Sequence, residues 1–178
     1  LGTFNDTAAD FPRDKCLHDL IGEQVLRSPD VPAVEFAGSQ LTYAELWECA
    51  GRVASWLRSH GVVADSIVAL QMDKSLEMAV AIVGVLSSGG AFLPMDPTWP
   101  LERGEFILED ACCGQLITHE QYAGEFESFG GSVLCLDDCH NVDENVDLLR
   151  LNSRVVGHRD ADVSSANLAY VIYTSGTT

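Results

Sequence analysis

Hydrophobic positions along the chain follow two periods that alternate. Longer stretches carry apolar side chains at the three- and four-residue spacing of a helix, whereas shorter runs are apolar and rich in β-branched side chains, as in buried strands. The first pattern predicts helices over residues 16–27, 43–60, 76–88, 100–111 and 120–126. The second pattern predicts strands over residues 32–36, 66–72, 91–95, 115–118, 132–136 and 168–173.

Strands and helices therefore alternate through most of the chain. This alternation is the βαβ pattern of a mostly parallel sheet covered by helices, so we predict an α/β fold. Ligands in such sheets bind outside the carboxyl ends of the strands. The end of the last predicted strand, near residue 173, is therefore a natural place for a site.

Short polar signals mark the ends of several predicted elements. Thr42 and Glu45 have the spacing of a capping box, in which a hydroxyl and a carboxylate satisfy each other's backbone N–H groups. Ser75 is a candidate cap for the helix that follows it. Gly61 and the glycine pair at 89–90 are placed to end helices.

Other stretches are predicted to lie outside regular elements. Residues 37–40 are predicted as a turn, and the next element is predicted to begin at Leu41. Residues 137–147 are predicted as an acidic, turn-like stretch. Residues 1–14 are small and polar, so we expect a linker there and one domain over 15–178. Residues 148–163 carry no clear pattern. The N-terminus resembles no signal peptide, and the missing initiator methionine suggests an excerpt of a longer protein.

Composition supports a folded domain and argues against some partners. The 178 residues are 47% hydrophobic, which is enough to bury a core. The net charge of −17 argues against binding nucleic acid through phosphate neutralisation and against binding an anionic membrane surface. The longest apolar run, residues 79–86, is too short to cross a bilayer. We therefore expect a cytoplasmic protein with no nucleic-acid or membrane partner.

The cysteines, histidines and tryptophans give no strong site. The six cysteines lack the layout of a secreted disulfide scaffold, which favours reduced thiols in the cytosol. Cys112 and Cys113 are interpreted as packing residues, with a reactive pair as the alternative. Residues 135–140 hold possible ligands, but Cys-x-x-x-Cys-His matches no strong zinc pattern, so no metal site is predicted. The tryptophans are expected in the core and the other histidines on helix surfaces or ends (Trp47, Trp56, Trp99, His18, His60, His119, His158).

The last predicted strand stops abruptly in hydroxyls and one glycine. We call Thr174, Ser175, Gly176, Thr177 and Thr178 the terminal loop. Its hydroxyls, its backbone N–H groups and one residue free to adopt positive φ are the parts of a cradle for phosphate oxygens. An ordinary polar loop is the alternative that spacing alone leaves open.

Several known motifs are absent from the terminal loop. It matches neither the Walker A pattern nor the G-x-S-x-G nucleophile elbow, and no G-x-G-x-x-G follows any predicted strand. Lys15 and Lys74 are the two lysines of the chain, and both precede the loop by a long distance in sequence. A phosphate site normally has a cation or metal beside it. If the terminal loop binds phosphate, the cationic partner of the loop is therefore missing from this chain.

Three segments resemble, in order, the first core motifs of the adenylate-forming enzymes, and most closely those of non-ribosomal peptide synthetase adenylation domains. Residues 41–46 resemble the first motif. Residues 85–96 resemble the second, with Ser-Ser where the family usually has Lys-Ala. Residues 168–178 resemble the first half of the third. Residues 5–12 are similar to the linker that follows a condensation domain, and the whole chain resembles the N-terminal part of the large subdomain.

The resemblance implies activation of an amino acid by Mg²⁺ and ATP to an aminoacyl-adenylate. The terminal loop would hold the ATP phosphates, mainly the β and γ groups. The acyl group would then pass to the phosphopantetheine thiol of a carrier-protein domain downstream, with a condensation domain upstream. The family's catalytic lysine and its adenine, ribose and side-chain motifs lie beyond the matching stretch, so no catalytic residue is assigned within residues 1–178.

Two other functions fit the same residues. One is an acyl- or aryl-CoA ligase of the same superfamily, against which the linker-like residues 5–12 argue. The other is an inactive scaffold module that keeps the fold, which the sequence after Thr178 would distinguish from an enzyme. On either enzymatic interpretation, we expect the 178-residue chain alone to be inactive.

Overall fold

The computed structural model describes residues 9–138 and 163–174. Most predicted elements are confirmed to within a residue or two, the usual uncertainty of element ends. The helices are α1 (Leu17–Arg27), α2 (Tyr43–Ser59), α3 (Leu76–Ser88), α4 (Leu101–Asp110), α5 (Glu120–Ala123) and the 3₁₀ turn η2 (Gly124–Phe126). The strands are β1 (Pro32–Phe36), β2 (Ser39–Thr42), β3 (Ile67–Gln71), β4 (Ala91–Met95), β5 (Gln115–Thr118) and β6 (Ser132–Cys135).

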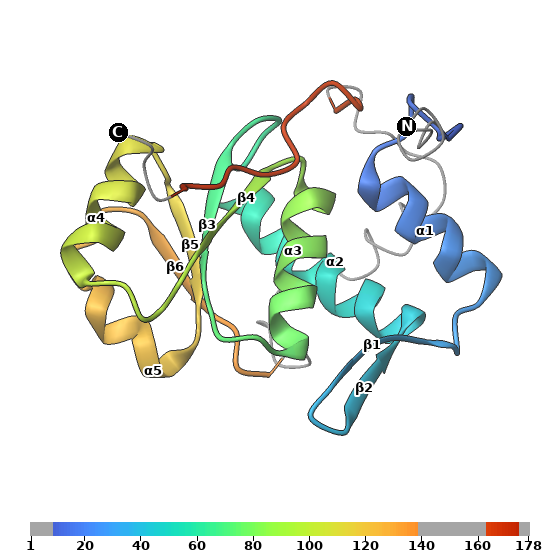
Figure 1. The fold of residues 1–178 in the computed structure, drawn as a ribbon, viewed down its shortest axis with the longest axis horizontal. Coiled ribbons are helices and arrows are strands. Elements are labelled where there is room, and N and C mark those ends of the chain that lie inside the picture. The colour runs from blue at the N-terminus through green and yellow to red at the C-terminus, as the bar shows by residue number, and fades with distance from the viewer. Residues whose placement is uncertain (1–8, 139–162, 175–178) are drawn as a thin grey trace, which may run out of the picture.

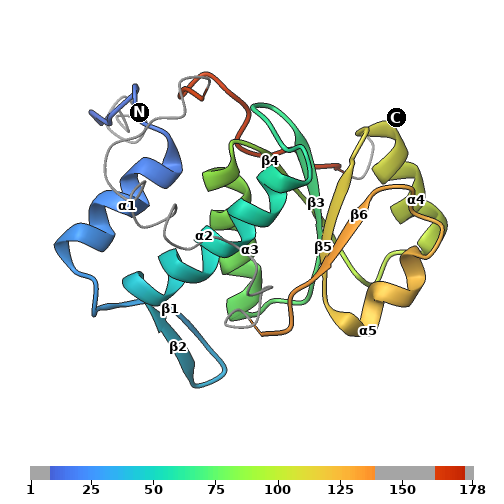
Figure 2. The same cartoon turned by 180° about the vertical axis from the view of Figure 1, so that it is seen from behind.

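The described elements form layers around one parallel sheet (Figure 1). Helices α2 and α3 lie on one side of the sheet, and α4 and α5 lie on the other side. Helix α1 and the β1–β2 hairpin lie beyond α2 and α3, away from the sheet (Figure 2). The predicted α/β class is therefore confirmed.

The order of strands in the sheet places a switch point between β3 and β5. The sheet runs β4-β3-β5-β6, and all its pairs are parallel. After β3 the chain moves outward to β4, and it then returns past β3 to form β5 on the other side. At such a reversal the two loops that leave the carboxyl ends diverge, which opens a crevice where α/β proteins commonly bind ligands.

Alternate residues of the strands supply two hydrophobic cores. Val68 and Leu70 of β3 pack with α2 and α3, whereas Ala69 packs on the opposite face with Ile107 of α4. All three β3 side chains are fully buried. Burial on both faces explains why these strands are continuously apolar and not alternating.

The predicted helix signals are confirmed at α2 and α3. Thr42 Oγ1 accepts the Glu45 N–H at 3.2 Å, and Glu45 Oε2 accepts the Thr42 N–H at 2.8 Å. Ser75 Oγ accepts the Met78 N–H at 3.1 Å. Gly89 ends α3 with φ of +98°, a left-handed conformation that costs glycine little.

The prediction for residues 37–40 was wrong in its extent. The turn is a two-residue hairpin connection at Ala37 and Gly38, with φ of +51° and +84°. Strand β2 begins at Ser39, so Leu41 lies inside a strand and does not open the next element. Alanine is an uncommon residue at positive φ, which is why the Ala-Gly pair gave a weak hairpin signal.

The predicted final strand, residues 168–173, was also wrong as a regular strand. We call these residues the approach segment. It runs parallel to β4 but forms a single bridge, between Tyr170 and Phe92. The backbone N–H and C=O groups of residues 91, 93 and 95 of β4 point toward β3. Those of residues 92 and 94 therefore point toward the approach segment. Pro94 has no N–H to donate, and the ladder stops after Phe92 for that reason.

Candidate phosphate-binding site

The approach segment carries the chain to the carboxyl edge of the sheet. The Phe92 N–H donates to the Ala169 carbonyl at 3.1 Å, and the Val171 N–H donates to the Phe92 carbonyl at 3.0 Å. Because the segment is parallel to β4, it ends at the edge where β3, β4, β5 and β6 also end. Both views show it lying along β4 (Figures 1 and 2). Thr174 therefore begins the terminal loop at the edge where α/β sheets bind ligands.

Tyr173 anchors the chain immediately before the terminal loop. Its ring packs in the core on the α4 side of the sheet, together with Val171 and Trp99. Its hydroxyl donates to the Asp110 carboxylate at the end of α4. This hydrogen bond, with a smaller contribution from burial, raises the pKa of Tyr173 to about 12, so the phenol stays protonated and donating at neutral pH.

The turn after β4 lies at the same edge and satisfies its own polar groups. Asp96 Oδ1 accepts the Thr98 hydroxyl at 2.7 Å and the Thr98 N–H at 2.8 Å. These two hydrogen bonds hold the pKa of Asp96 below its ordinary value. The Arg103 guanidinium lies 4.4 Å from the centre of the Trp99 ring. The Asp96 carboxylate of the turn and the Arg103 guanidinium of α4 thus each have a partner within this part of the chain.

The structure describes one of the five predicted site residues. Thr174 is exposed. Ser175, Gly176, Thr177 and Thr178 lie outside the described residues. Phosphate binding by the terminal loop therefore stays a prediction. Its support is that the approach segment runs toward the carboxyl edge of the sheet, where Thr174 follows it.

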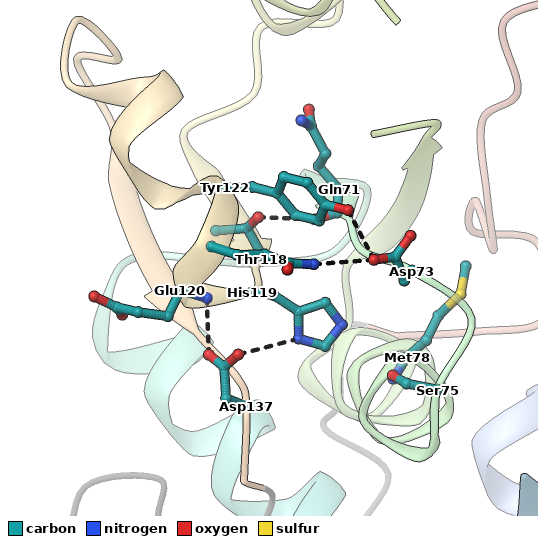
Figure 3. A network of polar contacts seen from close by, with 10 residues as sticks. Gln71, Asp73, Ser75, Met78, Thr118, His119, Glu120, Tyr122 and Asp137 are labelled. Carbon is teal, nitrogen blue, oxygen red and sulfur yellow. Dashed lines mark hydrogen bonds and ion pairs between the residues drawn. The ribbon is translucent and has the colours of Figure 1, made fainter. Parts of the chain in front are cut away.

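Side chains join the chain segments that leave β3 and β5 at the switch point (Figure 3). Asp73, in the loop after β3, accepts the Tyr122 hydroxyl at 2.7 Å and the Gln121 side-chain amide at 3.0 Å. The hydrogen bond to Asp73 is the main reason that the pKa of Tyr122 is raised. Beneath it, the buried Thr118 hydroxyl donates to the Gln71 carbonyl at 2.8 Å, which joins β5 to β3. The chain segments that leave β3 and β5 are therefore hydrogen-bonded to each other at the switch point.

His119 is a polar residue whose surroundings the sequence did not reveal. It is 9% exposed, and its Nδ1 lies 3.6 Å from Asp137, in the loop after β6. The same carboxylate accepts the Glu120 N–H at 2.8 Å. The prediction that His119 lies at a helix end is confirmed, because it precedes α5. Its carboxylate neighbour comes from another strand, so no spacing rule could have found it.

The described residues contain one compact group of possible metal ligands, Cys16, His18 and Asp19, whose ligand atoms lie within 4.8 Å of one another. Asp19 already accepts the Cys16 N–H at 3.0 Å, and the Cys16 side chain accepts the Asp19 N–H. These contacts form the capping box of α1, which accounts for the grouping. Of the weaker sequence candidate at 135–140, residues 139 and 140 lie outside the described residues.

The packing predictions for cysteine and tryptophan are confirmed in most respects. Cys113 is 8% exposed and packs in the core, whereas its neighbour Cys112 is exposed. The three tryptophans pack against the two cores (Trp47, Trp56, Trp99). Within the described residues, no helix is long and apolar enough to cross a membrane.

A family model described as AMP-binding enzyme matches residues 21–178. The chain belongs to this family. The motifs at 41–46, 85–96 and 168–178 all lie within the matching region, so the resemblance drawn from them is confirmed.

Two relatives are peptide synthetases of bacteria. The chain is 42% identical to one component of the mycosubtilin synthase of Bacillus subtilis over 176 residues, which is 98% of this chain and 6% of that protein. It is 37% identical to bacitracin synthase 1 of Bacillus licheniformis over 178 residues, which is 100% of this chain and 3% of that protein. The chain thus spans a small part of the length of these relatives.

Solved structures agree with this assignment. The non-ribosomal peptide synthetase FmoA3, bound to α-methyl-L-serine-AMP, matches 98% of this chain and 19% of its own, with a TM-score of 0.78 and 31% identity. VinN matches 94% of this chain and 44% of its own, with a TM-score of 0.77 and 25% identity. The match to FmoA3 confirms the fold expected from the three motifs, that of an adenylation domain.

Proposed function

We propose that the polypeptide containing this chain activates an amino acid as its adenylate. In this reaction a carboxylate oxygen of the amino acid attacks the α-phosphorus of ATP, the bond from that phosphorus to the β-phosphate oxygen breaks, and pyrophosphate leaves. The observation that carries the proposal is geometric. In a chain of the AMP-binding family, the approach segment leads to Thr174, at the carboxyl edge of a parallel sheet, and the sequence that follows supplies hydroxyls and one glycine.

The terminal loop would bind the β- and γ-phosphates of ATP. Thr174, Ser175, Thr177 and Thr178 supply hydroxyl donors, and Gly176 allows the backbone to approach a phosphate closely. The fixed phenol of Tyr173 and the core beneath it would hold the loop in place. Such preorganisation matters because a loop ordered only on binding spends part of its binding free energy on ordering.

Magnesium and a carrier thiol complete the proposed reaction. Hydroxyl and phosphate oxygens are the hard donors that Mg²⁺ prefers, so the metal would enter with ATP and screen its phosphate charge. The acyl group would then pass to the phosphopantetheine thiol of a carrier-protein domain.

The length of the relatives supports the proposed domain arrangement. The peptide-synthase relatives are much longer than this chain. We assign residues 1–14 to a linker after a condensation domain, residues 15–178 to the adenylation domain, and the protein to the cytoplasm.

An ATP–pyrophosphate exchange assay tests the proposal on the full-length polypeptide that contains this chain. We expect exchange that depends on one or a few amino acids. Thr174→Val, which removes one loop hydroxyl, should raise KM for ATP about tenfold, because one hydrogen bond to a charged group is lost. Ser39→Ala, at an exposed position of β2, is the control and should leave KM for ATP unchanged.

Three outcomes would contradict the proposal in different ways. Exchange with fatty or aryl acids in place of amino acids would favour the ligase alternative. Absence of exchange with any carboxylic acid, together with absence of ATP binding, would favour an inactive scaffold. Equal KM values for Thr174→Val and the parent protein would remove Thr174 from the phosphate site.

A further inference from the structure

Asp65 holds the chain where it enters the approach segment, at the end of the sheet opposite the terminal loop. It lies just before β3, and its carboxylate reaches residues that follow it by more than a hundred positions. Oδ1 accepts the Leu168 N–H at 2.7 Å, and Oδ2 accepts the Asn167 side-chain amide at 2.9 Å. Each carboxylate oxygen therefore has a separate partner on the incoming chain.

The geometry on the other side of this contact is also fixed. Asn167 Oδ1 accepts the Ser164 N–H at 2.8 Å, so the Asn167 amide cannot rotate by 180° without losing that bond. The Asn167 N–H donates to the Ser164 carbonyl at 3.0 Å, which closes a compact turn over residues 164–167. The amide nitrogen of Asn167 is thus aimed at Asp65 by bonds that do not involve Asp65.

The backbone of Asp65 is unusual for a residue with a side chain. Its φ is +64°, in the left-handed region where glycine is least strained. A glycine would relieve that strain but would offer no acceptor to Leu168 or Asn167. The two hydrogen bonds of the carboxylate give a physical reason for an aspartate at this position.

The approach segment needs such an anchor because its pairing is weak. One bridge to Phe92 joins it to β4, and Pro94 ends the ladder. A strand held by so few bonds can slip in register, and a slip of one residue would exchange its exposed and packed faces. Leu168, Tyr170 and Ile172 are exposed, while Val171 and Tyr173 are partly buried and pack against the core on the α4 side.

We infer that Asp65 is a positioning residue for the ATP-phosphate loop, since it sets the register of the approach segment that delivers the loop. The segment extends for about 17 Å from Leu168 to Tyr173 at the usual rise of a strand, so Asp65 acts through it and does not touch ATP. Asp65 fixes the beginning of the segment, and the Tyr173–Asp110 hydrogen bond fixes its end. This inference rests on the proposed function.

Exchanging the two partners tests the inference in the full-length polypeptide. Asp65→Asn keeps the size of the side chain but places an NH₂ group against the NH₂ of Asn167. Asn167→Asp places two carboxylates together. The double variant Asp65→Asn/Asn167→Asp restores a donor facing an acceptor, and the carboxylate introduced by Asn167→Asp can still accept the Ser164 N–H. Asp30→Asn, an exposed aspartate before β1, matches the change in charge and is the control.

Steady-state ATP–pyrophosphate exchange is the first measurement. We expect each single variant to raise KM for ATP about tenfold, with KM for the amino acid changed less than about twofold, because a misplaced loop weakens phosphate contacts. The double variant should recover most of the loss. If Asp65→Asn only lowers the amount of folded enzyme while KM for ATP stays the same, Asp65 has a structural role alone and the inference is wrong.

Hydrogen exchange measured by mass spectrometry is the second measurement and does not depend on activity. Peptides covering residues 165–174 should exchange faster in Asp65→Asn and return to the parent rate in the double variant. An unchanged rate of hydrogen exchange in these peptides of Asp65→Asn would overturn the inference. A parent protein that shows no exchange of pyrophosphate but shows this hydrogen-exchange pattern would refute the proposed function and retain the anchor.

Discussion

At the residue scale, chemistry in this chain is decided by neighbours that sequence spacing does not show. Cys112 and Cys113 are adjacent in sequence, yet one is exposed and the other is 8% exposed. Burial, and to a smaller extent the neighbouring Cys112 thiol, raises the pKa of Cys113 from 9.0 to about 11. The interpretation of this pair as packing residues therefore holds for Cys113 and not for Cys112.

This difference predicts selective alkylation. At pH 8, Cys112 should react with iodoacetamide faster than Cys113, because Cys112 is exposed, whereas burial raises the pKa of Cys113 and slows access to its thiol. The variants Cys112→Ser and Cys113→Ser each leave one thiol of this pair, so mass spectrometry of the peptide that contains it can follow each rate separately. Equal rates in the two variants would show that Cys113 is not buried in solution.

At the element scale, two glycines inside helices have opposite surroundings. A Cβ on Gly84 of α3 would lie 2.7 Å from Val53 Cβ of α2, which is closer than real side chains approach. A Cβ on Gly104 of α4 would meet its nearest neighbour, Met95 Cε, at 3.7 Å, an ordinary contact. Gly84 therefore permits the close packing of α2 on α3, whereas Gly104 only lowers the helical propensity of α4.

These surroundings predict stability changes of opposite sign. Gly84→Ala should lower the free energy of unfolding by about 1–3 kcal/mol, because the added methyl overpacks the helix interface. Gly104→Ala should raise it by about 0.5–1 kcal/mol, because alanine costs less conformational entropy in a helix. Urea denaturation of both variants measures the two changes, and each variant serves as the control for the other. A stabilising Gly84→Ala would mean that α2 and α3 lie farther apart in solution, and a destabilising Gly104→Ala would mean that the surroundings of Gly104 do not accommodate a methyl group.

At the scale of the whole molecule, the approach segment is held by contacts distributed along the sheet. Asp65 binds it at one end, Phe92 in the middle and Asp110 at the other end. The partners of Asp65 are a backbone N–H and an amide, which do not titrate. The hydrogen bonds from Leu168 and then from Asn167 hold the pKa of Asp65 below 3.8.

This lowered pKa predicts how the contribution of Asp65 depends on pH. A carboxyl with a lower pKa in the folded state stabilises fully above its unfolded pKa and loses that contribution as pH falls through its folded pKa. The stability difference between the parent protein and Asp65→Asn should therefore be constant from pH 7 to about 5 and shrink only below about 3.8. Denaturant titrations at several pH values measure it. A difference that disappears near pH 6 would mean that another group carries the effect.

The sequence by itself determined the elements, the α/β class and the family. Helical and strand periods, the capping box at Thr42 and Glu45, and the glycine stop at Gly89 are local signals, because each depends on residues within a turn or two. The three motifs added the family, since their order and spacing are linear properties of the chain. These features can be read without knowing which elements touch.

The tertiary structure decided how distant residues meet. It brought Asp65 to Leu168, Asp137 to His119 and Asp73 to Tyr122, which are pairs that no local pattern encodes. It also showed that the predicted final strand forms a single bridge. The approach segment lies opposite Pro94 of β4, which has no N–H to donate, and this matters only once the two segments lie side by side. Parallel pairing joins segments far apart in the sequence, so which contacts form depends on the folded sheet and not on local propensity.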